Sequence, residues 1–162
     1  MKKLILTFLI ILFALTSKVV WSDDFSKGLD AFKRGDYTTA LSEWRLLATE
    51  QGHIGAQFNL GLMFDNGYGV PKDEKAAADL FTRAAEQGNA SAQYNLGLLY
   101  ESGYGVLQDN IYAHMWGNIS ALNEYEDGRK LRDRVEKKMT SNDISVAQKL
   151  ARECEKKEYK GC

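Results

Sequence analysis

The sequence predicts an all-α fold, an α-solenoid of stacked antiparallel helix pairs that ends in a C-terminal helical cap. Residues 52–87 and 88–123 are identical at fourteen of thirty-six positions, and a fixed period in the thirties indicates stacked helical pairs. Ala, Leu, Glu, Lys and Arg dominate the composition, which favours helix over strand. Within each segment the apolar residues recur at helical spacing.

The N-terminal segment 1–22 has the pattern of a secretory signal peptide. Two lysines precede an apolar run over residues 4–15, and small residues follow. We expect cleavage after Ser22, with Ser17 as the second possibility, and a periplasmic or secreted product. The alternative is an uncleaved membrane anchor, but a spanning helix needs about 20 apolar residues and Lys18 interrupts the run.

The rest of the chain, 23–162, has the size of one domain. Removal of 1–22 lowers the formal charge from −1 to −4, because that segment holds three lysines and no acidic residue. A mildly acidic chain without a long basic run gives no electrostatic reason for nucleic-acid binding. We expect a monomer that binds no nucleic acid and, after cleavage, no membrane.

Four helical units follow one another along this domain. The first, 23–51, pairs a helix from about Asp24 to Lys33 with a second helix through a tight turn, "RGDY". The units 52–87 and 88–123 each have a first helix, a glycine-rich loop, and a second helix that Asp73 or Asp109 caps. Glycines at the unit junctions allow a left-handed backbone, except that Glu124 stands where a third junction glycine is expected, so this junction can bend differently.

The segment 124–162 closes the solenoid. A helix over 126–138 has a dense charged face, which we expect to be a solvated cap rather than a binding patch. Thr140 and Asp143 then have the spacing of a capping box, and the last helix runs to about Lys156.

At this point the chain resembles a known family. The segment "AQFNLGLMFDNGYGVPKDEKAAADLFTRAAEQG" is similar to the Sel-one-like repeat (SLR), a branch of the tetratricopeptide-like solenoids. Unit 23–51 is more similar to an ordinary tetratricopeptide repeat, and residues 113–153 resemble the C-terminal end of bacterial SLR proteins. The resemblance implies a helical solenoid that serves as an interaction module.

The phrase "GYGV" occurs in both SLR units, and two explanations compete for it. A phosphate-binding loop would need a third glycine, but Lys72 stands at that position. In the SLR family the phrase joins the two helices of a unit. We therefore predict four repeat-joint glycines: Gly67, Gly69, Gly103 and Gly105.

Large apolar side chains recur on one side of each first helix, opposite the side that packs within the unit. Asp65 and Glu101 fall on the same side. By the resemblance, this side matches the inner-face positions of tetratricopeptide helices, so we predict that it binds a partner. The alternative is that these side chains only pack against the neighbouring unit. The set, called here the first-helix arc, is Phe25, Phe58, Leu62, Tyr94 and Leu98.

The two cysteines, Cys154 and Cys162, are an even number in a chain predicted to be exported, which favours a disulfide. In the cysteine-rich secreted SLR branch the same spacing staples helical pairs, so the resemblance implies a bridge. An intermolecular bond is the alternative.

The predicted function is an exported scaffold or adaptor that holds a peptide or protein partner in its groove. The resemblance also implies two alternatives, a cell-wall-related or β-lactam-binding hydrolase and a secreted protein that contacts host cells. Hydrolase motifs such as S-x-x-K and G-x-S-x-G are absent from the sequence. Neither His53 nor His114 has a partner at metal-ligand spacing. We expect no enzymatic activity, no catalytic residue, no metal and no cofactor.

Overall fold

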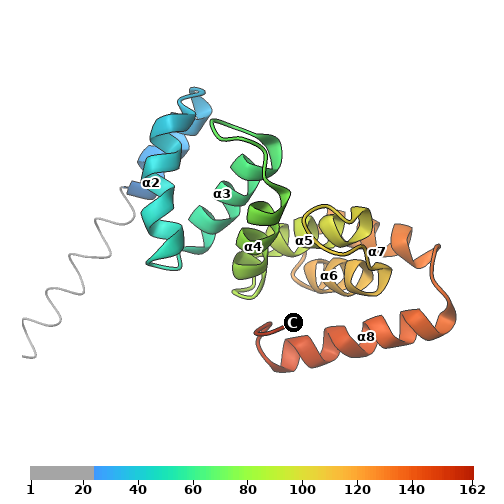
Figure 1. Cartoon of the computed structure of the whole chain (residues 1–162). Helices are drawn as coiled ribbons and strands as arrows, with labels where there is room; N and C mark the ends of the chain where they lie inside the picture. Colours follow the sequence, from blue (N-terminus) through green and yellow to red (C-terminus); the bar gives the residue numbers. More distant parts are fainter. Residues whose placement is uncertain (1–23) are drawn as a thin grey trace, which may run out of the picture.

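The computed structural model describes residues 24–162, so the predicted signal peptide lies outside the described residues. Every regular element in that range is a helix, which confirms the predicted all-α solenoid (Figure 1). A first helix covers 24–33. It is followed by α2 (Tyr37–Thr49), α3 (Ile54–Asn66), α4 (Glu74–Ala85), α5 (Ala90–Ser102), α6 (Asn110–Leu122), α7 (Glu126–Glu136) and α8 (Ser141–Lys156).

The helices from α2 to α7 stack in sequence order, and each one from α2 to α6 packs against the next. The period of thirty-six residues continues beyond the two SLR units, because α3, α5 and α7 begin at Ile54, Ala90 and Glu126. Thus α7 occupies the position of another first helix, and it packs against both α6 and α5. The C-terminal cap therefore begins as a further repeat.

Capping residues start the helices where the sequence predicts. The carboxylate of Asp73 accepts a hydrogen bond from Ala76 N at 2.9 Å, and Asp109 accepts from Ile111 N at 2.8 Å. Such side chains satisfy backbone N–H groups that have no partner within the helix. At α8 the capping box is present in full, with Thr140 and Asp143 bonded to each other's backbone N–H.

The glycine-rich joint of each SLR unit lies against the second helix of the unit before it. A side chain at Gly69 would place its Cβ 2.5 Å from Cβ of Tyr37, at the start of α2. At Gly105 the Cβ would lie 2.1 Å from the carbonyl oxygen of Glu74, at the start of α4. All four joint glycines have positive φ. The joint thus connects two helices and also sets the contact between units.

The core consists of side chains between helices rather than around a central cavity. Trp44, Phe81 and Trp116 are among the largest fully buried side chains. The indole Nε1 of Trp44 donates to the carbonyl oxygen of Phe25 at 3.2 Å, so the first two helices are tied by a hydrogen bond as well as by packing. Trp44 and Trp116 are therefore core residues.

A buried glutamine joins neighbouring units at two successive junctions. Gln57 donates to the carbonyl oxygen of Ala48 at 3.2 Å and accepts from Gln87 at 2.7 Å. Thirty-six residues later, Gln93 donates to Ala85 at 3.1 Å and accepts from Asn123. Because a buried amide is costly unless it is paired, these bonds define one relative position of adjacent units.

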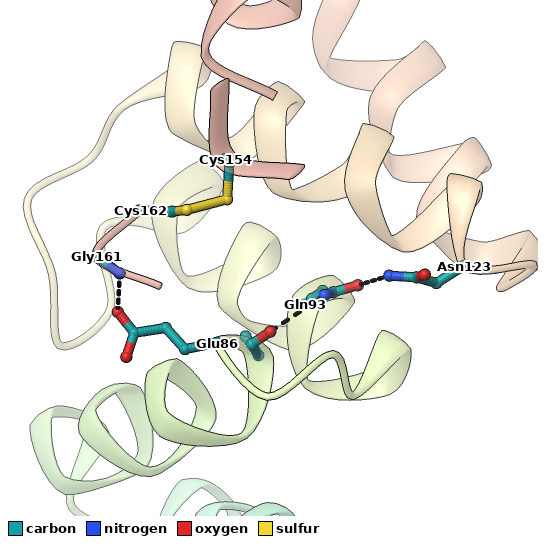
Figure 2. The surroundings of a disulfide bond; sticks show 7 residues. Glu86, Gln93, Asn123, Cys154, Gly161 and Cys162 are labelled. Carbon is teal, nitrogen blue, oxygen red and sulfur yellow. Dashed lines mark hydrogen bonds between the residues drawn. A yellow bond between two sulfur atoms is a disulfide. The ribbon is translucent and has the colours of Figure 1, made fainter. Parts of the chain in front are cut away.

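The last helix does not pair with α7 as a second helix normally would. Instead α8 packs along α6, and its chain end returns toward α4 (Figure 1). Cys154 and Cys162 form a disulfide with a Cα–Cα separation of 5.6 Å, and the N–H of Gly161 donates to the carboxylate of Glu86 at 2.9 Å (Figure 2). The C-terminal tail is thus connected to a unit junction far from it in sequence.

Candidate partner-binding surface

The five residues of the first-helix arc are all half-buried, and they belong to three apolar clusters rather than one. Phe25 packs on the cluster of the first two units, which includes Trp44. Phe58 and Leu62 pack on the cluster around Phe81. Tyr94 and Leu98 pack on the cluster of Ala113, Leu131 and Val135. The arc is therefore a series of contacts between helices, each with part of its surface exposed.

Phe25 lies at the contact between the first two units. Its ring centroid is 6.1 Å from that of Trp44 and 4.6 Å from the ring of His53. Gly55, on α3, is close enough that a Cβ there would lie 2.8 Å from the Phe25 ring. The next first helix therefore covers part of this ring, and the side chain as a whole is only half-exposed.

Phe58 contacts the second helix of its own unit, with its ring centroid 5.9 Å from that of Phe81. Leu62 follows one turn later on the same side of α3 and packs against the same cluster. Neither side chain is fully covered. The two side chains thus combine a packing role with an exposed portion.

Tyr94 and Leu98 lie where α5 meets α7. The ring of Tyr94 is 5.5 Å from that of Tyr125, the residue that precedes α7. Burial raises the pKa of the Tyr94 phenol above its ordinary value, and the nearby Asp127 carboxylate acts in the same direction. Tyr94 therefore stays a neutral hydrogen-bonding group at physiological pH.

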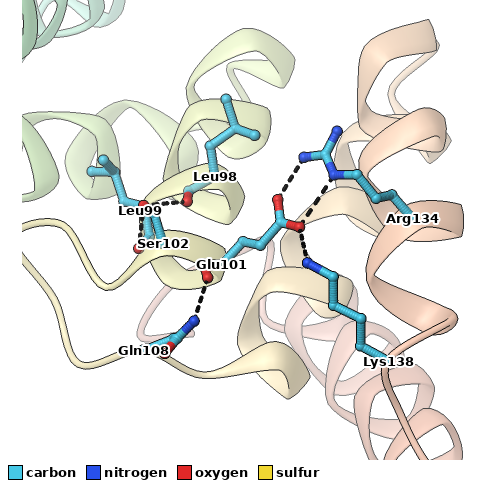
Figure 3. Close-up of polar contacts among 7 residues, drawn as sticks. All are labelled: Leu98, Leu99, Glu101, Ser102, Gln108, Arg134 and Lys138. Carbon is cyan, nitrogen blue, oxygen red and sulfur yellow. Dashed lines mark hydrogen bonds and ion pairs between the residues drawn. The ribbon is translucent and has the colours of Figure 1, made fainter.

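Next to Leu98, Glu101 is held by two cations from the α7 end of the chain (Figure 3). Its carboxylate accepts from Nε of Arg134 at 3.1 Å and from Nη2 at 2.5 Å, and it accepts from Nζ of Lys138 at 2.8 Å. The Glu101 side chain is 14% exposed, whereas Arg134 and Lys138 are 49% and 53% exposed. The Arg134 hydrogen bond is the main reason that the pKa of Glu101 lies below its ordinary value, although burial opposes it.

The sequence placed Glu101 on the same side of its helix as the arc and Arg134 on a solvated cap, but it did not predict that the two residues meet. The signal was the repeat period, because Glu126 begins α7 thirty-six residues after Ala90 begins α5. Extending the alignment of units by one more period would have set α7 beside α5. Because α7 is rich in charged residues whereas the other first helices are largely apolar, its sequence does not look like that of a first helix.

A metal site in residues 24–162 would need His, Cys, Asp or Glu side chains that cluster in space. Groups of three or more His, Cys, Asp or Glu residues placed to hold a metal are absent from this range. His114 is buried, with Nε2 3.4 Å from a carboxylate oxygen of Glu136. His53 instead caps α3, where its Nδ1 accepts from Ala56 N at 3.1 Å. His53 thus serves as a helix cap, and His114 is a buried residue beside Glu136.

None of the helices in the described part of the chain combines the length and the apolar composition needed to cross a membrane.

Comparison with known proteins identifies the repeats. The Sel1 repeat family matches residues 54–89 and 90–125. A protective antigen present in uropathogenic Escherichia coli strains, whose structure displays an SLR fold, is 32% identical with a TM-score of 0.81; the match covers 86% of this chain and 30% of that one. A Sel1 repeat protein from Oxalobacter formigenes is also 32% identical, with a TM-score of 0.60, over 65% of this chain and 43% of that one. This chain thus spans less than half of either structure, and among curated proteins no match was found.

Proposed function

The chain is a Sel1-like repeat protein, and from this premise we propose that it is an exported scaffold or adaptor that binds a protein or peptide on the inner face of its first helices. Helical solenoids of this kind generally act as protein-interaction modules and offer an extended curved surface rather than a deep pocket. The fold therefore supports a binding role without catalysis.

The observation that carries the proposal is the first-helix arc. Aromatic and leucine side chains recur on successive first helices, and each keeps an exposed portion beside the neighbouring helix. Rigid aromatic side chains in partly desolvated surroundings are where binding energy concentrates in interfaces. Because their packing between helices already restricts these side chains, the free energy lost in ordering them when a partner binds is small.

Site-specific photo-crosslinking tests this surface. A photoreactive phenylalanine analogue is placed at Phe58 or Tyr94, where an aromatic ring already exists. As a control it is placed at Tyr104, a 54% exposed residue of a repeat joint. We expect the same partner to be crosslinked in cells from Phe58 and Tyr94 but not from Tyr104. Thermal melting of each variant shows whether the solenoid is intact. Equal crosslinking from all three positions, or none from the arc in an intact solenoid, would reject the proposed surface.

Export is the second part of the proposal, and it is supported by the signal-peptide pattern of residues 1–22. The protein recovered from the periplasm should have the mass of a chain that begins at Asp23. A full-length chain retained in the inner membrane would contradict cleavage.

A second candidate function is contact with host cells after secretion. It is favoured by the similarity to a protective antigen of uropathogenic Escherichia coli, which covers 86% of this chain. The two candidates differ in where the protein accumulates. Recovery of most of the mature chain from the culture medium of intact cells would favour host contact, and recovery from the periplasm would favour the scaffold.

A further inference from the structure

The first-helix arc ends beside a row of cations. Lys130 and Arg134 stand four residues apart on one side of α7, and Lys138 follows in the turn after the helix ends at Glu136. This side faces α5, since Arg134 and Lys138 both bond to Glu101. Lys130 is already paired with Asp127 at 2.8 Å on its own helix.

The remaining two cations exceed the one carboxylate that they share. Glu101 is nearly buried and accepts three hydrogen bonds, so its charge is fully engaged. Arg134 uses Nε and Nη2 for Glu101, and among the described residues its Nη1 donates to no acceptor. The ammonium group of Lys138 makes a single hydrogen bond, to Glu101, so its other N–H donors can bind a further acceptor. The cluster thus keeps a net positive charge, with donors directed away from Glu101.

This charge is peculiar to the contact between α5 and α7. Thirty-six residues before Arg134 and Lys138, the equivalent positions on α5 are Leu98 and Ser102. The first helix of the preceding unit therefore has no cation at these positions. Along the first helices, the surface changes from aromatic and apolar to cationic at its C-terminal end.

Cations near the C-terminal end of α7 are also stabilised by the partial negative charge at that end of the helix dipole. That effect accounts for positive charge at the helix end in general but not for its position. Glu101, a residue of another helix, holds both cations at the end of α5, about one turn after Leu98 (Figure 3). A carboxylate that is nearly buried fixes two long side chains that would otherwise be free.

We propose that Arg134 and Lys138 bind side-chain carboxylates of an acidic peptide segment in the protein partner, whose adjacent apolar residues pack on Tyr94 and Leu98. This inference rests on the proposed function and specifies the chemistry of the partner. Charge complementarity argues for it, because an anionic group can bond to the free donors of the two cations while Glu101 keeps them in place.

The test uses a phage-displayed library of random peptides selected on the complete mature protein. Selection on the parent should enrich peptides that contain both Glu or Asp and a large apolar residue. Replacing Arg134→Gln and Lys138→Gln together should weaken binding of the selected peptides about five- to tenfold, as expected for the loss of two partly exposed charge pairs. The matched control removes two lysines of α8 instead, Lys149→Gln and Lys156→Gln, and should leave binding unchanged.

A third variant separates a binding role from a structural one. Glu101→Gln keeps a side chain that can accept hydrogen bonds but removes its negative charge. The positive charges of Arg134 and Lys138 are then no longer partly neutralised, and they attract an acidic peptide more strongly. Binding of the acidic peptides should then become tighter by about twofold or more. A cluster that served only to hold α7 in place would give a lower melting temperature and no tighter binding.

Enrichment of peptides without acidic residues, equal weakening by the α8 control, or no enrichment at all would overturn the inference. The proposed function fails separately, through the loss of arc-specific crosslinks. If Tyr94 still crosslinks a partner while no acidic preference exists, the binding surface stands and only the partner chemistry is wrong.

Discussion

Glu124 has a left-handed backbone conformation, and at the two preceding unit junctions this conformation belongs to a glycine. Its φ is 64°, compared with 65° at Gly52 and 86° at Gly88. A left-handed conformation costs an L-residue about 1–2 kcal/mol, because Cβ approaches the following carbonyl oxygen. The third junction therefore bends like the others in spite of its different residue. The surrounding packing of α6 against α7 holds Glu124 in this conformation.

Glu124→Gly should therefore stabilise the protein by about 0.5–1 kcal/mol, which is the relief of strain minus the greater entropy of glycine in the unfolded chain. Urea denaturation measures the change. The converse substitution, Gly88→Ala, should destabilise at the equivalent junction. A Glu124→Gly protein no more stable than the parent would show that the exposed Glu124 side chain makes a favourable contribution of its own.

His114 is the other residue whose surroundings are unusual. It is 1% exposed, and its Nδ1 is buried without a hydrogen-bond partner among the described residues. Burial lowers the pKa of its imidazole, although Glu136 opposes this effect; Arg132 also lowers it and Asp133 raises it. The folded protein therefore binds this proton less readily than the unfolded chain does.

The free energy of unfolding should consequently fall as the pH drops below 6.5, the ordinary pKa of histidine. The contribution of His114 to this fall is at most about 1.4 kcal/mol per pH unit. The sign follows because protonation of His114 is easier in the unfolded chain. His114→Leu should remove this part of the pH dependence, and urea denaturation at several pH values compares the two proteins. Identical slopes in the parent and the variant would exclude His114 as their source.

At the scale of elements, α6 and α7 approach closely because glycine stands on each side of their contact. A Cβ at Gly117 would lie 3.0 Å from the backbone nitrogen of Arg132. At Gly128 it would lie 2.4 Å from Oγ of Ser120, which donates to the carbonyl oxygen of Ala90. This close contact brings Arg134 within reach of Glu101. The cationic cluster thus depends on two glycines outside it.

Gly128→Ala should destabilise the protein by about 1–3 kcal/mol, because the added methyl group separates two packed helices. Thermal melting checks the stability. Arg129→Ala, an exposed change on the same helix, is the control and should cost less than about 0.5 kcal/mol. Equal melting temperatures for Gly128→Ala and the control would contradict this prediction, because α6 and α7 would then accommodate the methyl group without loss of stability.

At the scale of the whole molecule, α8 and its tail hold the last units together. Ala151 and Cys154 are buried in the same cluster as Trp116 of α6. The phenol of Tyr159 donates to the side-chain oxygen of Asn123 at 3.3 Å, and Asn123 in turn donates to Gln93 (Figure 2 shows the second bond). The tail thereby contacts two successive unit junctions. The units 52–87 and 88–123 are thus held together by contacts along their side as well as by direct packing on each other.

Replacement of Cys154 and Cys162 by Ser should lower the free energy of unfolding by about 2.5 kcal/mol, the value for closing so short a loop in the chain-entropy model. Urea denaturation measures the loss, and free-thiol titration of the parent should find almost no thiol. A dimer on a non-reducing gel would show instead that the bond joins two chains.

Local chemistry determined the helices and their order. Caps at Asp73, Asp109 and Thr140, the period of thirty-six and the joint glycines are all properties of short segments, so the sequence alone predicted them. The arc was also predictable as a recurring side of the first helices, because helical geometry places residues four apart on one face.

The tertiary structure alone decided the placement of α8 on α6, the left-handed turn at Glu124 and the cluster of Glu101 with Arg134 and Lys138. Each depends on contacts between residues distant in sequence. Close packing at Gly117 and Gly128, rather than any local preference of α7, brings its cations to α5. Packing of side chains across helices therefore determines which charges meet, whereas backbone periodicity determines only which helices form.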